Sequence, residues 1–462
     1  MTEKMKKSRD AAMPNENKEM ELEIEGLAYG GRGVARHEGL VYFIERGLPG
    51  QKVRAGIYNV KKRFAEGVAI DVLRESEHRV EKFCEHFPDC GGCAFQDLDY
   101  DVQLEWKRSW VAENLRRIAG FEEATVKPVL PSPETRRYRN KMEFAFGGSK
   151  DRGLHLGLRN RFDPSRLVDV TDCRIQSEEM NAVLNRAREL ARESRAPVWN
   201  AKTGKGYWRY LVVRRSQSLG GLLVQAITAP KKNFDPVAQR LGDKLREDFP
   251  GITFVHSIRF SREAVAQGQK RIFASGSGTL RERISGVDYD IPAEAFFQTN
   301  TPAAEALYEQ VAEMAALTGQ ERVLDLYSGV GSPALNLAEK AGWVKGLEVM
   351  PAAVEYAARN TELNGISNVS FEARDASELP AGIDGADVVV ADPPRAGLEP
   401  KALAGIMALQ PRRIVYISCN PAALARDAGR FAEKYRLEEV RPVDLFPHAA
   451  HIECAALFTL LK

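Results

Sequence analysis

Two stretches near the carboxyl terminus carry side chains able to do covalent chemistry on a pyrimidine. The apolar run 414–418 predicts a buried strand, and Cys419 follows directly at its end. A thiolate that adds to carbon 6 of uracil makes carbon 5 nucleophilic enough to attack a methyl sulfonium. Glu453 precedes the last predicted strand, 454–460, where a carboxylate could remove the proton from carbon 5. The alternatives are a small apolar core cysteine and a surface carboxylate.

An acid-proline-proline sequence ends another predicted strand. Asp392 follows the apolar run 386–391, which is typical of a strand buried on both faces. Pro393 and Pro394 restrict the backbone that follows, so the carboxylate would be held rigidly near a reacting base. Methyltransferases that act on exocyclic amino groups have a similar loop, so this motif alone does not choose the chemistry.

Three further strand ends carry groups suited to a nucleoside cofactor. The run 323–327 leads into the glycine turn 328–331, Glu348 ends the next strand, and Asp375 follows the one after. Such a turn lets a ligand approach the backbone, while the two acids could accept hydrogen bonds from ribose hydroxyls and an adenine amino group. This is the layout of S-adenosylmethionine-dependent methyltransferases. A nicotinamide-binding domain or a plain glycine turn is the alternative, because the third glycine of a dinucleotide fingerprint is missing.

Four cysteines form a candidate metal-ligand set. Cys84, Cys90 and Cys93 lie in a short glycine-containing loop, and Cys173 is the remaining cysteine once Cys419 and the core candidate Cys454 are set aside. Four thiolates suit either a [4Fe–4S] cluster or structural zinc, and the spacing favours neither. With six cysteines in 462 residues, a disulfide scaffold is excluded.

The elements that must position these residues fall into three regions. Residues 18–76 hold short strand-like runs separated by glycines, which predicts a small barrel. Residues 128–292 are β-rich and basic. From 293 onward, strands alternate with helices at 333–341, 351–363, 400–409 and 421–434, which predicts a doubly wound, mostly parallel sheet. The expected fold class is therefore multi-domain α/β.

One basic stretch of the central region indicates a nucleic-acid surface. Residues 201–215 hold five Lys/Arg and no acid, interleaved with Tyr207, Trp208 and Tyr210. Cations such as Lys205, Arg209 and Arg214 could follow phosphates while the rings stack on unpaired bases. The alternative is a solvated charged face beside core aromatics.

Taken together, the motifs resemble those of the bacterial RNA (uracil-C5-)methyltransferases of the iron–sulfur type, which methylate 23S ribosomal RNA. The resemblance covers nearly the whole chain, and its most specific segments are 297–300, 325–331, 392–395, 418–421 and 451–453. It implies a TRAM barrel (18–76), a central cluster-bearing domain (77–95 and 128–292) and a methyltransferase domain (96–127 and 293–462).

The resemblance also implies roles for individual residues. Cys419 would be the nucleophile and Glu453 the base. The cofactor-contacting positions would be Gln298, Tyr327, Ser332, Glu348, Asp375 and Asp392. A [4Fe–4S] cluster rather than zinc would be held by Cys84, Cys90, Cys93 and Cys173. Ser328 stands where the family usually has cysteine, and Ser332-Pro333 replaces a polar residue and Phe-Thr.

These observations predict a cytoplasmic, monomeric enzyme whose partner is RNA, 23S ribosomal RNA above all. No run of about 18 apolar residues is present, which excludes a transmembrane helix, and the charged N-terminus is unlike a signal peptide. The alternatives are a transfer RNA uridine carbon-5 methyltransferase, an exocyclic-amino RNA methyltransferase, which would have no use for Cys419, and a non-catalytic RNA-binding protein.

Overall fold

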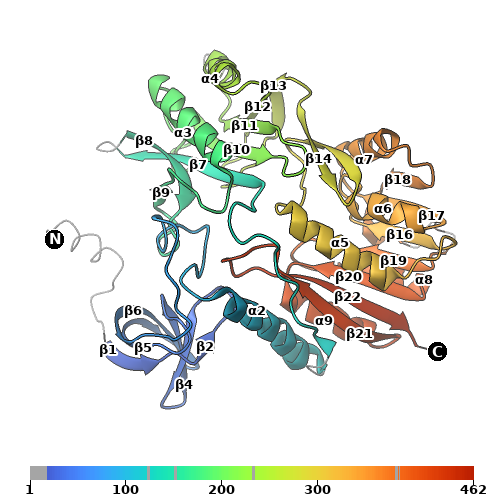
Figure 1. Cartoon of the computed structure of the whole chain (residues 1–462), viewed down its shortest axis with the longest axis horizontal. Helices are drawn as coiled ribbons and strands as arrows, with labels where there is room; N and C mark the ends of the chain where they lie inside the picture. Colours follow the sequence, from blue (N-terminus) through green and yellow to red (C-terminus); the bar gives the residue numbers. More distant parts are fainter. Residues whose placement is uncertain are drawn as a thin grey trace. The chain divides into compact units, whose positions relative to one another are not determined.

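The computed structural model describes residues 18–121, 125–149, 153–231, 235–379, 383 and 385–461. It divides into two compact units. The first holds the described residues up to Trp110 together with Leu158–Val168 and Phe446–His451. The second holds Val111–Gly157, Asp169–Leu445 and the residues from Ile452 onward. Figure 1 labels the helices and strands used below.

The first unit is built on a six-stranded sheet of order β1-β5-β6-β4-β3-β2. Its strands are β1 (Lys18–Glu23), β2 (Gly26–Leu27), β3 (Gly33–His37), β4 (Leu40–Glu45), β5 (Lys52–Val60) and β6 (Phe64–Arg74). Leu22, Ile44 and Val53 belong to its buried apolar core. The short glycine-bounded runs over 18–76 therefore form strands as predicted. Helix α2 (Tyr100–Asn114) begins in this unit, where Trp110 Nε1 donates to Leu27 O at 2.7 Å.

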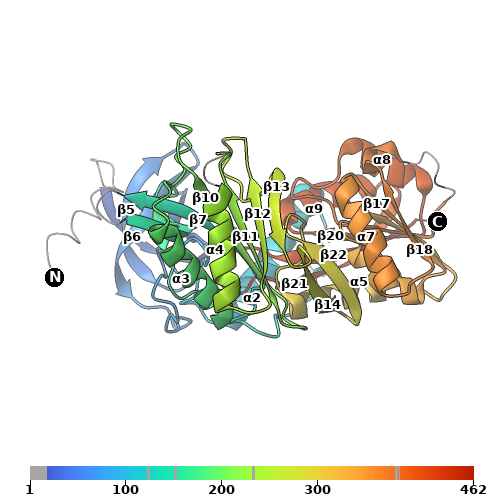
Figure 2. The same ribbon diagram turned by 90° about the horizontal axis from the view of Figure 1, so that it is seen from above.

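The second unit begins with a seven-stranded sheet of order β13-β12-β11-β10-β7-β8-β9. Its strands are β7 (Lys141–Ser149), β8 (Gly153–Arg159), β9 (Leu167–Asp169), β10 (Trp208–Arg215), β11 (Leu222–Thr228), β12 (Thr253–Ile258) and β13 (Lys270–Ser275). Helices α3 (Glu178–Glu193) and α4 (Asp235–Asp248) lie together along one side of this sheet, as Figure 2 shows. A separate hairpin of β14 (Thr279–Ile284) and β15 (Val287–Pro292) follows.

The same unit continues into a second seven-stranded sheet, of order β18-β17-β16-β19-β20-β22-β21. Its strands are β16 (Arg322–Leu326), β17 (Trp343–Glu348), β18 (Val369–Ala373), β19 (Val388–Ala391), β20 (Arg413–Ser418), β21 (Tyr435–Val443) and β22 (Glu453–Leu460). The first five in this order are parallel, and β22 runs antiparallel to both of its neighbours. This confirms the predicted doubly wound sheet.

Helices cover both faces of this second sheet. The helices are α5 (Thr301–Ala315), α6 (Ser332–Leu337), α7 (Pro351–Leu363), α8 (Pro400–Leu409) and α9 (Pro421–Phe431). Leu324, Val389 and Tyr416 point to the face covered by α8 and α9, with Ile406 and Phe431 in the same buried cluster. Strand order reverses between β16 and β19, which opens the crevice where doubly wound sheets bind their ligands.

Candidate active site

Strand topology brings the predicted catalytic residues to one edge of the second sheet. β19 and β20 are parallel neighbours, so Asp392 and Cys419, which follow them, stand side by side at their carboxyl ends. The antiparallel register of β20 and β22 pairs Ser418 with Cys454. Glu453, one residue before Cys454, therefore lies beside Cys419. The three predicted residues meet although 61 positions separate the first from the last in a chain of 462 residues.

Burial dominates the electrostatics of this edge. It raises the pKa of Asp392 to about 7. Glu453 is only 7% exposed, and burial together with the charge of Asp392 raises its pKa well above the ordinary value. Burial, Glu453 and Asp392 raise the pKa of the Cys419 thiol to about 11, while Arg395 opposes the shift. At neutral pH the free site therefore holds a protonated Cys419 thiol beside a buried carboxyl whose pKa is raised.

The loop that carries Cys419 is fixed to the acid-proline-proline loop. Asn420 caps α9 by accepting a hydrogen bond from Ala422 N at 3.1 Å. Its Nδ2 donates to Arg395 O at 2.9 Å. Ser418 Oγ donates to Asn420 O at 3.1 Å, which closes the turn around the cysteine. The residues on either side of Cys419 are thus fixed, while the thiol itself stays partly exposed.

Asp427 anchors the other end of the acid-proline-proline loop. This fully buried carboxylate on α9 accepts hydrogen bonds from Leu398 N and from the Tyr416 hydroxyl, both at 2.9 Å. Arg426 Nε donates to its second oxygen at 2.9 Å. Gly397 has φ +80°, and a Cβ there would lie 2.5 Å from Asp427 Oδ2, so the loop needs glycine at this point. No motif in the sequence singled out Asp427.

The glycine turn and the first of the two predicted cofactor acids form one bonded unit. Glu348 accepts hydrogen bonds from Gly329 N at 3.1 Å and from Met350 N at 2.9 Å. Gly331 has φ +97°, and a Cβ on it would lie 2.9 Å from the Phe371 ring. Asp375 is exposed, and its pKa is lowered because it accepts hydrogen bonds from Ser377. The structure therefore places both acids at strand ends, and Glu348 is bonded to the turn.

Two further buried residues lie at the predicted cofactor positions: Tyr308, which belongs to no sequence motif, and Asp325, the first residue of the segment 325–331. Burial raises the pKa of Tyr308 on α5, and the side chains of Ser332 and Gln298 oppose this shift, so both predicted contact residues act on one hydroxyl. Asp325 is fully buried, and its Oδ2 accepts from Ala334 N at 3.1 Å. Its Oδ1 has no hydrogen-bond partner among the residues that the structure describes. A buried acceptor with no donor marks a place where a donor on a ligand would be favoured.

Gln298 is positioned through its backbone. Asn140, just before β7, donates through Nδ2 to Gln298 O at 3.1 Å and to Thr301 Oγ1 at 3.0 Å. Asn300 caps α5, and its Nδ2 donates to Ser132 Oγ at 3.0 Å and to Leu445 O at 3.1 Å. The segment 297–301 is therefore bonded both to Asn140, at the start of the sheet that holds β7, and to the connection between β21 and β22.

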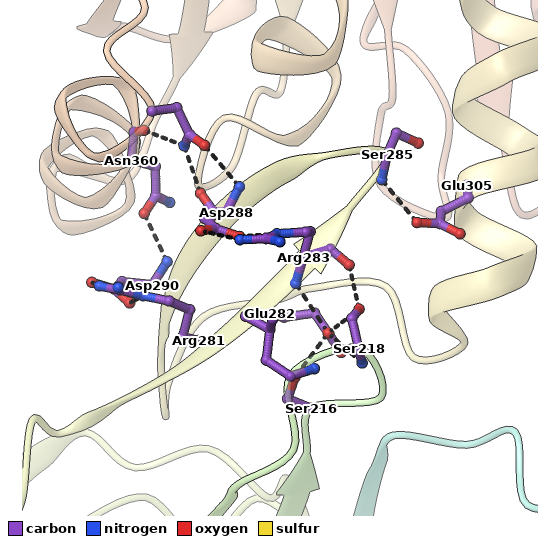
Figure 3. A network of polar contacts seen from close by, with 12 residues as sticks. Ser216, Ser218, Arg281, Glu282, Arg283, Ser285, Asp288, Asp290, Glu305 and Asn360 are labelled. Atoms are coloured by element: carbon purple, nitrogen blue, oxygen red, sulfur yellow. Dashed lines mark hydrogen bonds and ion pairs between the residues drawn. The ribbon is translucent and has the colours of Figure 1, made fainter.

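Glu282 is a buried residue of the β14–β15 hairpin, shown in Figure 3, and it bonds the turn between β10 and β11 to Thr301. Glu282 is 1% exposed and accepts six hydrogen bonds at 2.7–3.1 Å without a cation among its donors. The donors are Ser216 Oγ, Gln217 N, Ser218 N, Ser218 Oγ, Arg283 N and Thr301 Oγ1. The turn between β10 and β11 and the start of α5 therefore meet on one carboxylate.

The outer side of the same hairpin is bonded to α7 and α5, as Figure 3 also shows. Cross-strand pairs join Arg281 to Asp290 and Arg283 to Asp288, each through two contacts of 2.5–2.9 Å. Asp290 N donates to Asn360 Oδ1 at 2.8 Å. The hairpin is thus bonded on both sides, to α7 and to the start of α5, which follows the predicted cofactor residue Gln298.

The predicted metal ligands lie in both units. In the first unit, Cys84 and Cys93 are buried and Cys90 is half-buried. Gln96 Nε2 donates to Cys93 Sγ at 3.1 Å, and Arg161 Nη1 donates to Cys93 O at 3.0 Å. In the second unit Cys173 is buried. Across the described residues, no set of three or more His, Cys, Asp or Glu side chains is arranged to hold a metal ion. The ligand set stays a prediction.

The interpretation of 201–215 as a phosphate-binding stretch is wrong for Arg209 and Arg214. Both are almost fully buried, at 3% and 2% exposure. Arg214 donates to Ala295 O, and Arg209 donates to the carbonyls of a neighbouring loop. Tyr207 and Trp208 are wholly buried. Buried guanidinium groups bonded to backbone carbonyls brace the sheet, so only the exposed start of this stretch can meet a polyanion.

Two protein families match separate parts of the chain. The tRNA (uracil-5-)-methyltransferase family matches residues 279–460, and the TRAM domain matches residues 15–70. An uncharacterized RNA methyltransferase of Nitratidesulfovibrio vulgaris is 44% identical over 95% of this chain and 96% of its own. One of Chlorobaculum tepidum is 37% identical over 89% of both chains.

A solved structure matches nearly the whole chain. It is the tRNA (uracil-54, C5)-methyltransferase of Pyrococcus abyssi in complex with S-adenosyl-L-homocysteine. The two proteins are 32% identical, with a TM-score of 0.77, and the match covers 95% of this chain and 100% of that one.

The sheet order and the strand-end site define a class I methyltransferase preceded by a TRAM domain. More narrowly, the chain belongs to the RNA (uracil-5-)methyltransferase family and is an S-adenosylmethionine-dependent enzyme. This membership confirms the predicted chemistry at uracil carbon 5 over exocyclic-amino methylation and over a non-catalytic role. Among the described residues, no helix is both long and apolar enough to cross a membrane.

Proposed function

We propose that this protein methylates carbon 5 of a uridine in 23S ribosomal RNA, with Cys419 as the nucleophile and Glu453 as the base. The observation that carries the proposal is the β20–β22 register, which sets Glu453 beside Cys419 at the strand end next to Asp392. A nucleophile and a base on adjacent strands can reach the two neighbouring carbons of one pyrimidine ring. We place the enzyme in the cytoplasm, acting as a monomer.

The residues act in a fixed order. The Cys419 thiol passes its proton to solvent, and Sγ bonds to carbon 6. Carbon 5 would then bond to the methyl group as the methyl–sulfur bond of the sulfonium donor breaks, with the thioether as leaving group. Glu453 takes the proton from carbon 5, and the electron pair left behind expels the Cys419 thiolate. Because the free thiol has a pKa of about 11, substrate binding must supply positive charge or a proton acceptor, and Arg395 is the cation that already favours the thiolate. The buried environment also keeps water from the covalent intermediate.

S-adenosylmethionine supplies the methyl group when bound, and the crevice fits its functional groups. We infer that Glu348 and Asp375 would accept hydrogen bonds from ribose and adenine, and that Gln298, Tyr327, Ser332 and Asp392 would complete the contacts. The unpartnered Asp325 Oδ1 supports this fit, because an amino group would satisfy it. Asp325→Asn should weaken cofactor binding measured by calorimetry.

The RNA class is tested by comparing two transcripts. Transfer RNA is the second candidate, because a structure that is 32% identical is a tRNA (uracil-54, C5)-methyltransferase. Tritium release from carbon 5-labelled uridine should be faster with 23S ribosomal RNA than with transfer RNA, and Cys419→Ala should release none from either. Preferential release from transfer RNA would overturn the ribosomal assignment and leave the chemistry intact.

We further propose that Cys84, Cys90, Cys93 and Cys173 hold a [4Fe–4S] cluster with a structural role. The donor chemistry fits, because four cysteines are the ligand set of a [4Fe–4S] cluster, and Cys93 Sγ accepts a hydrogen bond from Gln96 Nε2 at 3.1 Å. Purified protein should be brown, and Cys90→Ser should bleach it and weaken RNA binding more than cofactor binding. A colourless protein with one equivalent of zinc would overturn the cluster.

A further inference from the structure

An aromatic ring is held in solvent at the end of a wholly buried strand. All six residues of β12 are buried, and so is Arg259, which follows them. Phe260 comes next and is 58% exposed. Its neighbour Arg262 is also exposed. Covering such a side chain removes apolar surface from water, which is favourable.

The loop around Phe260 is braced to an unusual degree. Arg209 donates to the carbonyls of Arg259 at 3.0 Å, Ser261 at 2.6 Å and Glu263 at 2.8 Å. Thus one buried guanidinium fixes every second carbonyl across this stretch. Its Cζ also lies 5.0 Å from the centre of the Trp199 ring. Arg209, which is too buried to contact phosphate, therefore fixes the backbone of the exposed loop 259–263.

A second set of contacts fixes the backbone of Phe260 from the other side. Gln269 Oε1 accepts hydrogen bonds from Phe260 N at 2.6 Å and from Ser261 N at 3.0 Å. Arg259 donates to Gln267 O at 3.0 Å and pairs with Glu263 at 2.5 Å. The ring is therefore presented on a preorganised backbone, which lowers the entropy lost when a ligand binds.

Exposed cations lie on the loop of Phe260 and on the turn that this loop contacts. Arg262 Nη2 lies 3.0 Å from where a Cβ on Gly204 would stand, so this loop adjoins the turn 200–205. Lys202 and Lys205 on that turn are exposed, and Asn200 fixes the turn by accepting from Lys202 N at 2.9 Å and Thr203 N at 3.1 Å. Within the described residues, Arg262, Lys202 and Lys205 form no ion pair. Glu263, the acid that follows Arg262 in the chain, is paired with Arg259.

We infer that Phe260, with Arg262, Lys202 and Lys205, forms a platform that binds a single-stranded segment of the substrate RNA. An unpaired base would stack on Phe260 while the three cations neutralise adjacent phosphates. An exposed ring beside cations on fixed loops fits single-stranded RNA, whose unpaired bases can stack on the ring. The bases of an RNA duplex are stacked on one another and cannot stack on a side chain in the groove. The inference rests on the proposed function, since it takes the occupant to be the RNA that is methylated.

Binding of a substrate RNA transcript by three variants tests the stacking. Phe260→Ala should weaken binding about 5- to 150-fold, the range expected for one stacked base. Phe260→Trp should bind at least as tightly as wild type, because a larger ring still stacks. Leu363→Ala removes an apolar side chain on α7 that is 37% exposed and should change nothing. Equal losses in Phe260→Ala and Phe260→Trp would overturn the inference.

Salt dependence tests the cations. Arg262→Gln should lower the magnitude of the slope of log affinity against log salt by about 0.7, and Lys244→Gln, whose lysine pairs with Glu247 on α4, should leave it unchanged. A normal slope for Arg262→Gln would overturn the phosphate contact. If Phe260→Ala binds as well as wild type while wild type releases tritium from uridine, the platform is wrong and the proposed function stands. If wild type releases none, the proposed function fails.

Discussion

The side-chain amide of Asn420 donates a hydrogen bond of 2.9 Å to the carbonyl of Arg395, and this contact joins the loop of Cys419 to the loop of Asp392. The same side chain caps α9 through its Oδ1. Asn420 therefore both caps α9 and fixes the Cys419 loop to the Asp392 loop. The two tasks can be separated by substitution, because only the second needs a donor.

Replacing Asn420 by Ser should separate these tasks. Serine is as good a helix cap as asparagine, so the free energy of unfolding should change by less than about 1 kcal/mol. The shorter side chain loses its hydrogen bond to Arg395 O, and the Asp392 loop is then free to shift. A misplacement of about 1 Å typically costs on the order of 10²-fold in rate, so kcat should fall strongly with little change in KM. A kcat equal to that of wild type would show that the contact does not set the spacing.

Asp392 predicts a pH-dependent stability. Its pKa is raised by burial to about 7 from 3.8, so the folded state favours the protonated form. The contribution of the protonated Asp392 to the free energy of unfolding is fully present below about pH 4 and is lost as the pH rises through 7. Asp392→Asn is neutral throughout, so relative to wild type its free energy of unfolding should increase between pH 4 and pH 8, by at most about 1.4 kcal/mol per pH unit. Urea titrations at several pH values measure this, and a constant difference would contradict it.

Glu282 predicts a coupling between the two sheets of the second unit. In Glu282→Gln the amide nitrogen cannot accept, so at least two of the six donors lose their acceptor, at about 1–3 kcal/mol each. The free energy of unfolding should fall by several kcal/mol, and kcat should fall because Thr301 and the segment before it lose their support. Differential scanning calorimetry and single-turnover kinetics measure the two effects.

A matched control for Glu282 lies on the facing helix. Glu305 on α5 also bonds the hairpin, but only by accepting from Ser285 N at 2.8 Å near its exposed tip. Glu305→Gln keeps an oxygen for that one donor, so both stability and turnover should stay near wild type. Equal behaviour of the two variants would remove any special role from Glu282.

Much of the methyltransferase sheet could be predicted from sequence because its strands are continuous apolar runs that end in glycine, proline or an acid. The residues that sit at those ends, such as Asp392 and Cys419, are then placed by topology alone. Helix α5 escaped prediction, since its alanine-rich stretch 301–315 offers little contrast between an apolar and a polar face.

The errors and omissions share a different cause. Arg209 and Arg214 were expected on the surface because arginine is charged, but backbone carbonyls can satisfy a buried guanidinium, and sequence does not show where such carbonyls lie. Tyr308, Asp427 and Glu282 belong to no recognised motif. Each acts through partners far away in sequence, so only the folded chain reveals them.

Glu453 and Cys419 act at opposite ends of one series of steps, and this order gives the sharpest prediction. In Glu453→Gln the nucleophile, the cofactor crevice and the volume at position 453 are kept, but the base is lost. Addition of Cys419 and methyl transfer can proceed, whereas expulsion of the thiolate needs the electron pair released by deprotonation of carbon 5. The methylated base should stay bonded to the protein.

The trapped species should be a protein–RNA adduct that survives denaturing electrophoresis and carries label from the methyl group of the cofactor. Wild type should show little adduct and Cys419→Ala none, because no bond to carbon 6 forms without the thiol. Burial of Glu453, at 7% exposure, strengthens the expectation, since solvent has poor access to replace the missing base. Normal turnover of Glu453→Gln would make Glu453 a strand-end carboxylate without a catalytic role. An adduct that persists in the double variant Glu453→Gln, Cys419→Ala would assign the nucleophile to another residue.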